Sequence, residues 1–453
     1  MAEWIPLFMF LAVCVFLLFG YPVALTLAGT ALGFAAIGIA NGIFDPALLK
    51  AMPDRLFGIM TNETLVAVPL FILMGMMLEK SNLAEELLEN MAHVFGRLPG
   101  GLGISVVVVG TLLAASTGIV GATVVAMGLM SLPTMLRRGY DSAFATGTIC
   151  ATGTLGQIVP PSIALVLLGD VLSNAYQQAQ LQTGGFSSNT ISIGDLFLGA
   201  IVPGLILVLG YIAYVVFTAV AQPAKAPAVT NLTDISSRQI IKSLLPPITL
   251  MVVVLGSIMA GLATPTEASA VGAIGATILA LVKGKLSLKT VQDVGQGTLK
   301  MTSMVFLILI GASLFSLVFR GYGGDHLVQS LFDSMPGGLF GAMVIVMLVI
   351  FLLGFILDFI EITFVVVPIV GPILMLMGAD PIWLGIMIAV NLQTSFLTPP
   401  FGFALFYLRG VTPDSVATSQ IYRGVLPYIA IQLLLLGVLA LWPGLVTWLP
   451  YSF

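Results

Sequence analysis

The sequence predicts an all-α membrane protein with two inverted repeats, about ten spanning helices and two re-entrant helical hairpins. Three observations predict this class. Apolar residues make up 58% of the 453 positions and charged residues only 8%, against roughly 25% charged residues in soluble proteins. Apolar stretches of membrane-spanning length recur along the chain, and two longer stretches are interrupted by glycines and polar residues. So few charges cannot cover a water-exposed surface of this size, so most of the chain must face lipid.

Ten apolar stretches have spanning or near-spanning length. In chain order they cover residues 5–19, 22–41, 64–79, 142–169, 196–220, 243–260, 265–282, 301–319, 381–408 and 424–448. The first twenty residues contain Glu3 but no lysine or arginine. This favours a first membrane helix over a cleaved signal peptide.

Segments 101–136 and 338–377 are longer and are interrupted. The first breaks at Ser116-Thr117-Gly118, and the second at Gly354, Asp358 and Glu361. Each arm of the first has about 15–18 residues, or roughly 22–27 Å as a helix, which is short of a hydrocarbon core of about 30 Å. Such short arms predict hairpins that return to the side they entered from.

The lysines and arginines predict the orientation in the membrane. With the N-terminus outside and both hairpins returning, the outer face receives only Lys50, Arg55 and Arg320 of the 16 basic residues. The other basic residues all fall on the inner face, as the positive-inside rule requires. Both termini are therefore predicted to lie outside.

Three motifs recur in the same order in the two halves. They are Pro-Gly-Gly-Leu at 99–102 and 336–339, Gly-x-Asp at 139–141 and 378–380, and Pro-Pro at 160–161 and 399–400. An odd number of predicted crossings separates the two Pro-Gly-Gly turns, so the halves are expected to be inverted. This predicts one repeat over 1–222, a cytoplasmic linker at 223–242 and a second repeat over 243–453. Inverted repeats with interrupted helices are typical of secondary transporters.

The span that follows each hairpin, at 142–169 and at 381–408, carries one of the double prolines. Two adjacent prolines remove two amide donors, so the helix is expected to break there. Freed carbonyls with nearby hydroxyls suit a sodium ion, and the start of the next half-helix suits an anion. The alternative, a simple packing kink, is less favoured because the pattern occurs twice.

Three acidic residues are predicted at membrane depth, where such residues are usually functional. Asp358 is the best candidate for a carboxylate at a cation site. Glu267 follows Thr264-Pro265 and is expected to cap a helix. Glu361 is left open as a ligand, a protonatable group or a lumen-facing residue.

Several functions are excluded or disfavoured. The net charge of −4 argues against nucleic-acid binding. Two histidines and two cysteines offer little for a catalytic or metal centre. An intramembrane enzyme would need a nucleophile with a base, or metal ligands, at membrane depth, and neither is present in the predicted spans. We therefore expect a transporter and no enzyme.

The motifs resemble the large membrane subunit of tripartite ATP-independent periplasmic (TRAP) transporters over nearly the whole chain. The matching segments include 20–24, 68–75, 101–141, 153–156, 160–162, 263–268, 357–358 and 398–400. The resemblance implies an elevator mechanism in the bacterial inner membrane, with periplasmic termini. It implies two or more Na⁺ ions driving uptake of a small organic anion, of the carboxylate or sulfonate class. It also implies a periplasmic substrate-binding protein and a separate small four-helix membrane subunit.

The resemblance also implies sites by motif position. The first sodium site is expected to involve Ser116, Thr117, Gly118, Gly153, Gly156 and Val159. The second is expected to involve Gly354, Asp358, Gln393, Phe396 and Thr398. The residues expected to face the substrate are Gln157, Pro160, Pro161, Ser162, Thr394, Ser395, Pro399 and Pro400.

The broken spans are bulkier and more polar than the glycine-rich family pattern, at Gln157 and at Gln393–Ser395, which leaves the substrate open. A stand-alone sodium/organic-anion symporter of related fold, needing no binding protein, is the alternative.

Overall fold

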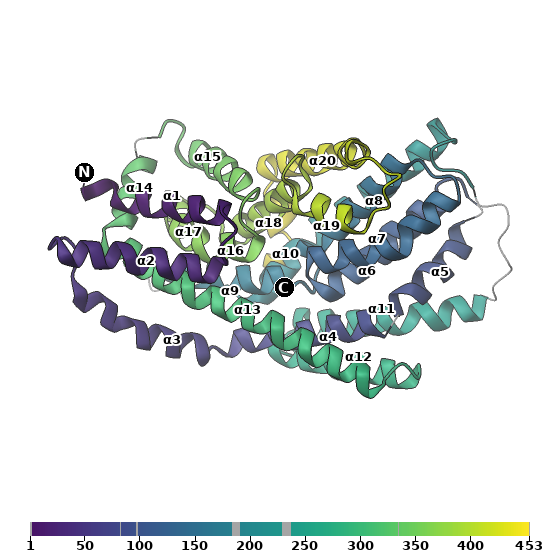
Figure 1. Cartoon of the computed structure of the whole chain (residues 1–453), viewed down its shortest axis with the longest axis horizontal. Helices are drawn as coiled ribbons and strands as arrows, with labels where there is room; N and C mark the ends of the chain where they lie inside the picture. Colours follow the sequence, from purple (N-terminus) through teal and green to yellow (C-terminus); the bar gives the residue numbers. More distant parts are fainter. Residues whose placement is uncertain are drawn as a thin grey trace. The chain divides into compact units, whose positions relative to one another are not determined.

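The computed structural model describes residues 2–81, 83–96, 98–183, 191–228, 237–333 and 335–452, and the elements within them are all helices (Figure 1). The chain forms two compact units. Unit 1 comprises Met1–Val66, Leu167–Ser192 and Lys300–Gly385, and unit 2 comprises Ala67–Val166, Ile193–Leu299 and Ile386–Phe453. Each unit contains segments of both predicted repeats.

Unit 1 is built from helices of the N-terminal and central parts of the chain. They are α1 (Ile5–Leu18), α2 (Val23–Ala40), α3 (Met52–Met60), α14 (Gly324–Asp333), α15 (Gly338–Leu353), α16 (Phe359–Val365) and α17 (Val367–Leu376), with the greater parts of α9 (Ile163–Thr183) and α13 (Leu288–Gly321) and short 3₁₀ turns at Ala2–Trp4, Pro46–Ala51 and Glu63–Val66. Within this unit α1 packs on α2, and α17 packs on α14, α15 and α16.

Unit 2 holds the first hairpin and most of both proline-broken helices. Its helices are α4 (Ala67–Lys80), α5 (Leu83–Phe95), α6 (Gly101–Thr117), α7 (Val120–Arg137), α8 (Ser142–Thr154), α10 (Ile193–Ala221), α11 (Ser237–Met259), α12 (Pro265–Val282), α19 (Phe403–Val411), α20 (Thr418–Leu441) and α21 (Gly444–Thr447), with most of α18 (Pro381–Leu397) and 3₁₀ turns at Leu155–Gln157 and Pro450–Ser452. Around α8 lie α6, α7 and α20, while α12 packs on α4.

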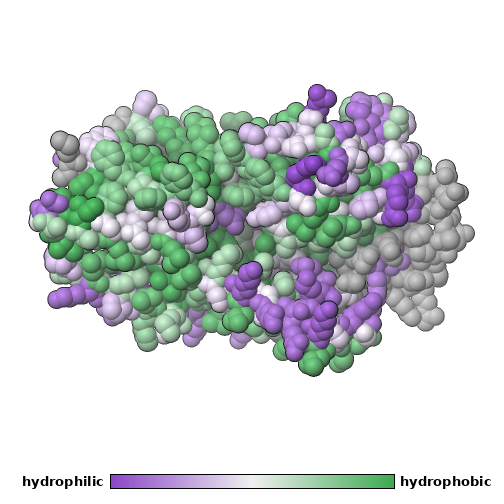
Figure 2. All heavy atoms as spheres, in the orientation of Figure 1, coloured by the Kyte–Doolittle hydropathy of each residue, from purple (hydrophilic) through white to green (hydrophobic). Residues whose placement is uncertain are grey.

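The described helices confirm an all-α polytopic membrane protein. Six of them are long and apolar enough to cross a membrane, or up to eight if two bent pairs each form one span. Large apolar side chains lie exposed on the outer faces of the helices, among them Phe8, Leu11 and Leu25 on α1 and α2. Figure 2 shows apolar residues covering much of the face in view. Such a surface fits lipid rather than water.

Several predicted boundaries hold and others shift. The span predicted at 265–282 is α12. The first long segment divides into α6 and α7, and the second divides into α15, α16 and α17. The span predicted at 142–169 ends within α9, which continues to Thr183. Its last turns are rich in alanine, glutamine and leucine, which favour helix.

Other predicted spans also differ from the helices. The span predicted at 301–319 belongs to α13, which begins at Leu288. The side chain of Ser287 accepts from the Thr290 amide at 3.0 Å and so caps this earlier start. The span predicted at 381–408 is divided between α18 and α19.

The recurring motifs have the same local structure in both halves. Gly100 and Gly337 adopt left-handed conformations, with φ of +75° and +94°, before α6 and α15. Asp141 accepts from the Phe144 amide at 2.9 Å, and Asp380 accepts from the Trp383 amide at 2.8 Å. The Pro-Gly-Gly and Gly-x-Asp motifs therefore each begin a helix in the same way in both halves. The repeat boundaries and their inverted orientation stay predictions.

Candidate functional site

The first hairpin turns at a left-handed glycine. α6 ends at Thr117, Gly118 follows with φ of +62°, and Ile119 is extended before α7 begins. A side chain is strained at such a φ, which explains glycine at this turn. Ser116 lies in the last turn of α6, but its side chain lies outside the described residues. The predicted break therefore lies where the hydroxyl-rich motif ends.

Two threonine hydroxyls meet at this tip. The Oγ1 atoms of Thr117 and Thr123 are 2.7 Å apart, and both side chains are buried. Thr117 Oγ1 also lies 3.0 Å from the Leu113 carbonyl, and Thr123 Oγ1 lies 3.0 Å from the Ile119 carbonyl. Since each hydroxyl has one proton and two lone pairs, both oxygens keep acceptor capacity toward a cation.

Glycines let the hairpin tip approach the first broken helix. A Cβ on Gly156 would lie 2.8 Å from the Ala114 carbonyl oxygen, and one on Gly118 would lie 2.9 Å from the Ile163 nitrogen. A Cβ on Gly153 would meet the side chain of Val124 on α7. These approaches show that the first hairpin packs closely against α8 and the break that follows it, while sodium binding by the predicted residues stays a prediction. Val159 lies in the break itself, half-buried beside Gly204 of α10.

The first break lies between α8 and α9. Pro160 and Pro161 are buried there, and the peptide bond between them is cis. The Ser162 hydroxyl lies 2.7 Å from the Gly156 carbonyl, so this side chain satisfies backbone that the break leaves unpaired. Gln157 is 2% exposed, and its Oε1 has no hydrogen-bond partner among the described residues. A buried amide oxygen without a partner suits a ligand.

The second break, also in unit 2, separates α18 from α19. Thr398 Oγ1 donates to the Thr394 carbonyl at 2.7 Å, and the rings of Phe396 and Phe403 lie edge to face, 5.3 Å apart. A Cβ on Gly402 would lie 2.5 Å from the Phe396 carbonyl oxygen. The chain therefore doubles back tightly on the end of α18.

The predicted substrate-facing residues of this second break differ in exposure. Thr394 and Ser395 are fully buried within α18, whereas Pro399 is half-buried and Pro400 is exposed. Their contact with a substrate stays a prediction.

Gln393 joins the two broken helices. Its Nε2 donates to Thr154 Oγ1 at 3.3 Å, while its buried Oε1 has no partner in the part of the chain that the structure describes. Tyr211 of α10 lies close to the same two side chains and accepts from Gln432 of α20 at 2.8 Å. Sequence reasoning missed Thr154, Tyr211 and Gln432. Polar side chains inside apolar spans were the available signal.

The second hairpin, in unit 1, begins its return arm with a capping box. Asp358 Oδ1 accepts from the Phe359 amide at 2.6 Å, and Glu361 Oε2 accepts from the Asp358 amide at 2.9 Å. The Glu361 side chain is buried, and through this hydrogen bond its carboxylate caps the helix. An Asp-x-x-Glu spacing in the sequence was the signal for this role. The same box at Thr264 and Glu267 confirms the cap predicted there.

The residues predicted for the second sodium site belong to different units. Gly354, at the end of α15, and Asp358 lie in unit 1, while Gln393, Phe396 and Thr398 lie in unit 2. Their meeting at one site stays a prediction.

The comparisons with known proteins agree on one family. The model of the "Tripartite ATP-independent periplasmic transporter, DctM component" family matches residues 10–445. The C4-dicarboxylate TRAP transporter large permease protein DctM of Pseudomonas aeruginosa is 31% identical over 413 residues, covering 90% of this chain and 91% of that protein. The sialic acid TRAP transporter large permease protein SiaM of Vibrio cholerae is 28% identical, covering 96% of each.

A solved structure supports the fold independently. The YdaH transporter of Alcanivorax borkumensis matches with a TM-score of 0.63, covering 97% of this chain and 99% of that one. At 15% identity this likeness concerns the fold alone.

Proposed function

Since this chain belongs to the DctM component family of tripartite ATP-independent periplasmic transporters, a large permease of the inner membrane, we propose that it couples sodium entry to uptake of a small organic anion. The anion belongs to the carboxylate or sulfonate class. The observation that supports this proposal most directly is the cluster of buried oxygens where the first hairpin tip meets a broken helix. The Thr117 and Thr123 hydroxyls, 2.7 Å apart, form its centre.

This oxygen set fits a sodium ion. Sodium prefers hard oxygen ligands, and the tip supplies hydroxyls and helix-end carbonyls instead of sulfur or imidazole. The Oε1 atoms of Gln157 and Gln393, which have no partner within the described ranges, are further oxygens in the same unit. We assign the first sodium to the tip and break residues. We assign the second to Gly354, Asp358, Gln393, Phe396 and Thr398.

The transport step is proposed to be an elevator movement of the two hairpins and two broken helices against the other helices. The Gln393–Thr154 hydrogen bond supports this, because it ties the two broken helices together. Bound sodium neutralises the charge of the arriving anion, so both cross together.

Two partners complete the proposed system. They are a periplasmic substrate-binding protein and a small four-helix membrane subunit. The family that this chain matches is described as one component of a tripartite transporter, which supports two further components beside it.

Proteoliposomes test the coupling. The ligand retained by the partner binding protein is first identified by mass spectrometry, and its uptake is measured with both partners present. An inward sodium gradient is expected to drive accumulation, and an equal potassium gradient is not. Equal uptake with both ions would refute sodium coupling and point to protons. Uptake of free substrate without the binding protein would favour the stand-alone symporter.

A further inference from the structure

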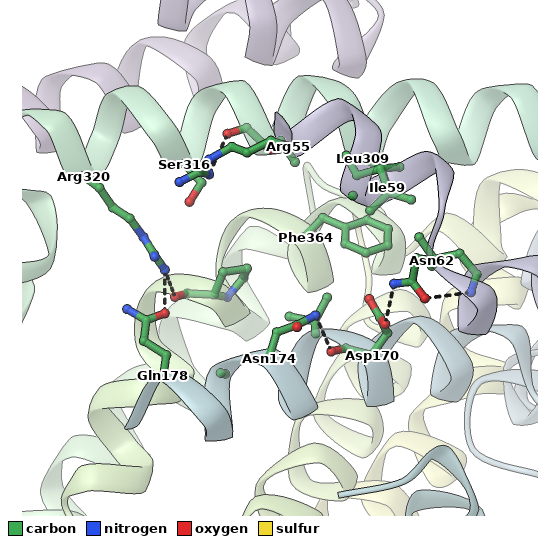
Figure 3. Close-up of a pocket in the computed structure, with 17 residues that line it drawn as sticks. Arg55, Ile59, Asn62, Asp170, Asn174, Gln178, Leu309, Ser316, Arg320 and Phe364 are labelled. Atoms are coloured by element: carbon green, nitrogen blue, oxygen red, sulfur yellow. Dashed lines mark hydrogen bonds between the residues drawn. The ribbon is translucent and has the colours of Figure 1, made fainter. Parts of the chain in front are cut away.

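Unit 1 contains a cavity of about 470 Å³ (Figure 3). Its walls come from α3, α9 and α13, with Phe364 of α16 and Pro368 of α17. This volume lies within the roughly 300–1,000 Å³ range of small-ligand sites. Two arginines and one aspartate line it, which is unusual inside a chain with only 8% charged residues.

One part of the cavity is positively charged. Arg320 is held by Gln178 Oε1 at 2.8 Å and pairs with Asp325 at 3.4 Å. Arg55 donates to the Ser313 carbonyl at a long 3.4 Å, and no carboxylate of the described residues lies within 4.0 Å of its guanidinium. Arg55 therefore supplies a positive charge that the described residues do not neutralise. Its fork of donors suits a carboxylate or sulfonate.

Another part carries a fixed acceptor. Asp170 Oδ1 accepts from Asn62 Nδ2 at 2.9 Å (Figure 3). The side-chain Nδ2 of Asn174 donates to the backbone carbonyl of Asp170 at 2.9 Å. Asn62 is itself oriented, because its Oδ1 accepts from the Thr64 amide at 2.9 Å. An ionised carboxylate has about four acceptor positions, so one hydrogen bond leaves capacity for a ligand donor. The same charge repels a second anionic group.

We propose that this cavity binds a small organic monoanion, with its carboxylate or sulfonate at Arg55 and Arg320 and a hydroxyl or ammonium group at Asp170. The predicted orientation places both arginines on the outer face. There the cavity receives an anion before it reaches the hairpin tips, and in this respect the inference rests on the proposed function. Binding itself requires no sodium.

Two probes of equal chain length test the site. 4-Hydroxybutanoate and succinate differ only in carrying a hydroxymethyl or a carboxylate at one end. Binding is measured by calorimetry on the whole chain in phosphatidylcholine nanodiscs and sodium-free buffer. We expect 4-hydroxybutanoate to bind about tenfold or more tightly than succinate, because the second carboxylate meets Asp170.

Two variants test which residue binds each end of the ligand. R55Q is expected to weaken 4-hydroxybutanoate binding about tenfold or more, and D170N is expected to abolish the preference over succinate. R423Q removes an exposed arginine in unit 2 and is the matched control, with unchanged binding expected. Equal affinities in the wild type, or equal losses in R55Q and R423Q, would overturn the proposal. So would displacement of the probe by phosphatidylglycerol, since a lipid phosphate would then be the occupant.

Labelling gives a second, local measurement. Ser316 lines the cavity, and S316C is prepared with C14A and C150A to remove both native thiols. A negatively charged methanethiosulfonate is expected to react with this cysteine faster than a positively charged one. R55Q is expected to lower the ratio of the two rates, and bound 4-hydroxybutanoate is expected to protect the cysteine from labelling. Equal rates without protection would contradict an anion site. Intact sodium-driven uptake alongside that result would overturn this inference alone.

Discussion

At the scale of single residues, the Thr117 hydroxyl is the most direct test of the first sodium site. T117V keeps the side-chain shape but removes an oxygen that lies 2.7 Å from Thr123 Oγ1. Loss of one such interaction is expected to raise the sodium concentration for half-maximal uptake about three- to tenfold. The measurement is uptake in proteoliposomes over a series of sodium concentrations.

Thr111 provides the matched control in the same helix. Its hydroxyl bonds only to the Val107 carbonyl among the described residues, at 2.6 Å, so T111V removes a hydroxyl away from the tip. Its sodium dependence should match the wild type. A similar shift in both variants, or none in T117V, would show that the tip hydroxyl does not bind sodium.

Individual residue roles were only partly predictable. Ser116-Thr117-Gly118 marks a turn in the sequence because hydroxyls and glycine interrupt an apolar run. The roles of Tyr211 and Gln432 depend on which distant spans become neighbours, and no local pattern carries that information. The roles of Asp358 and Glu361 could be predicted locally, because their three-residue spacing is that of a capping box.

At the scale of elements, sequence predicted where helices break better than where they end. Double prolines and glycines act locally, through missing amide donors and left-handed backbone, so α8–α9 and α6–α7 separate as expected. Helix ends beyond the apolar runs depend on polar residues that also suit loops. The extension of α9 to Thr183 and the early start of α13 at Leu288 were missed for that reason.

The close approach of the first hairpin to α9 depends on Gly118. G118A places a methyl group 2.9 Å from the Ile163 nitrogen and also strains a φ of +62°. We expect a loss of roughly 1–3 kcal/mol in the free energy of unfolding, with reduced sodium-driven uptake. Denaturant titration of the protein in detergent measures the first effect.

Two other glycines provide controls that distinguish the effect of backbone strain from the effect of steric crowding. Gly139 has a similar φ of +77°, but its Cβ would lie 3.8 Å from Pro227, so G139A reports the strain alone. Gly29 lies within α2 with open space around it, so G29A is expected to be neutral or slightly stabilising. Equal losses in G118A and G139A would show that contact with α9 contributes nothing.

At the scale of the whole molecule, the strongest untested prediction is the inverted orientation of the two hairpins. It follows from counting crossings and from placing all but three of the 16 basic residues inside. Both ends of the first hairpin are predicted to lie on the inner face of the membrane, and both ends of the second on the outer face. No single helix carries this information, because it depends on every crossing between them.

Cysteine labelling in intact cells tests that inversion. In a chain carrying C14A and C150A, R137C follows the first hairpin and M377C follows the second. Because basic residues hold the first of these turns in the cytoplasm, a membrane-impermeant maleimide is expected to label M377C readily and R137C only after the membrane is permeabilised. A cysteine at the exposed Lys225, introduced as K225C, is the inner-face control. Labelling of both hairpin positions from the same side would show parallel halves and would contradict the predicted inverted repeats.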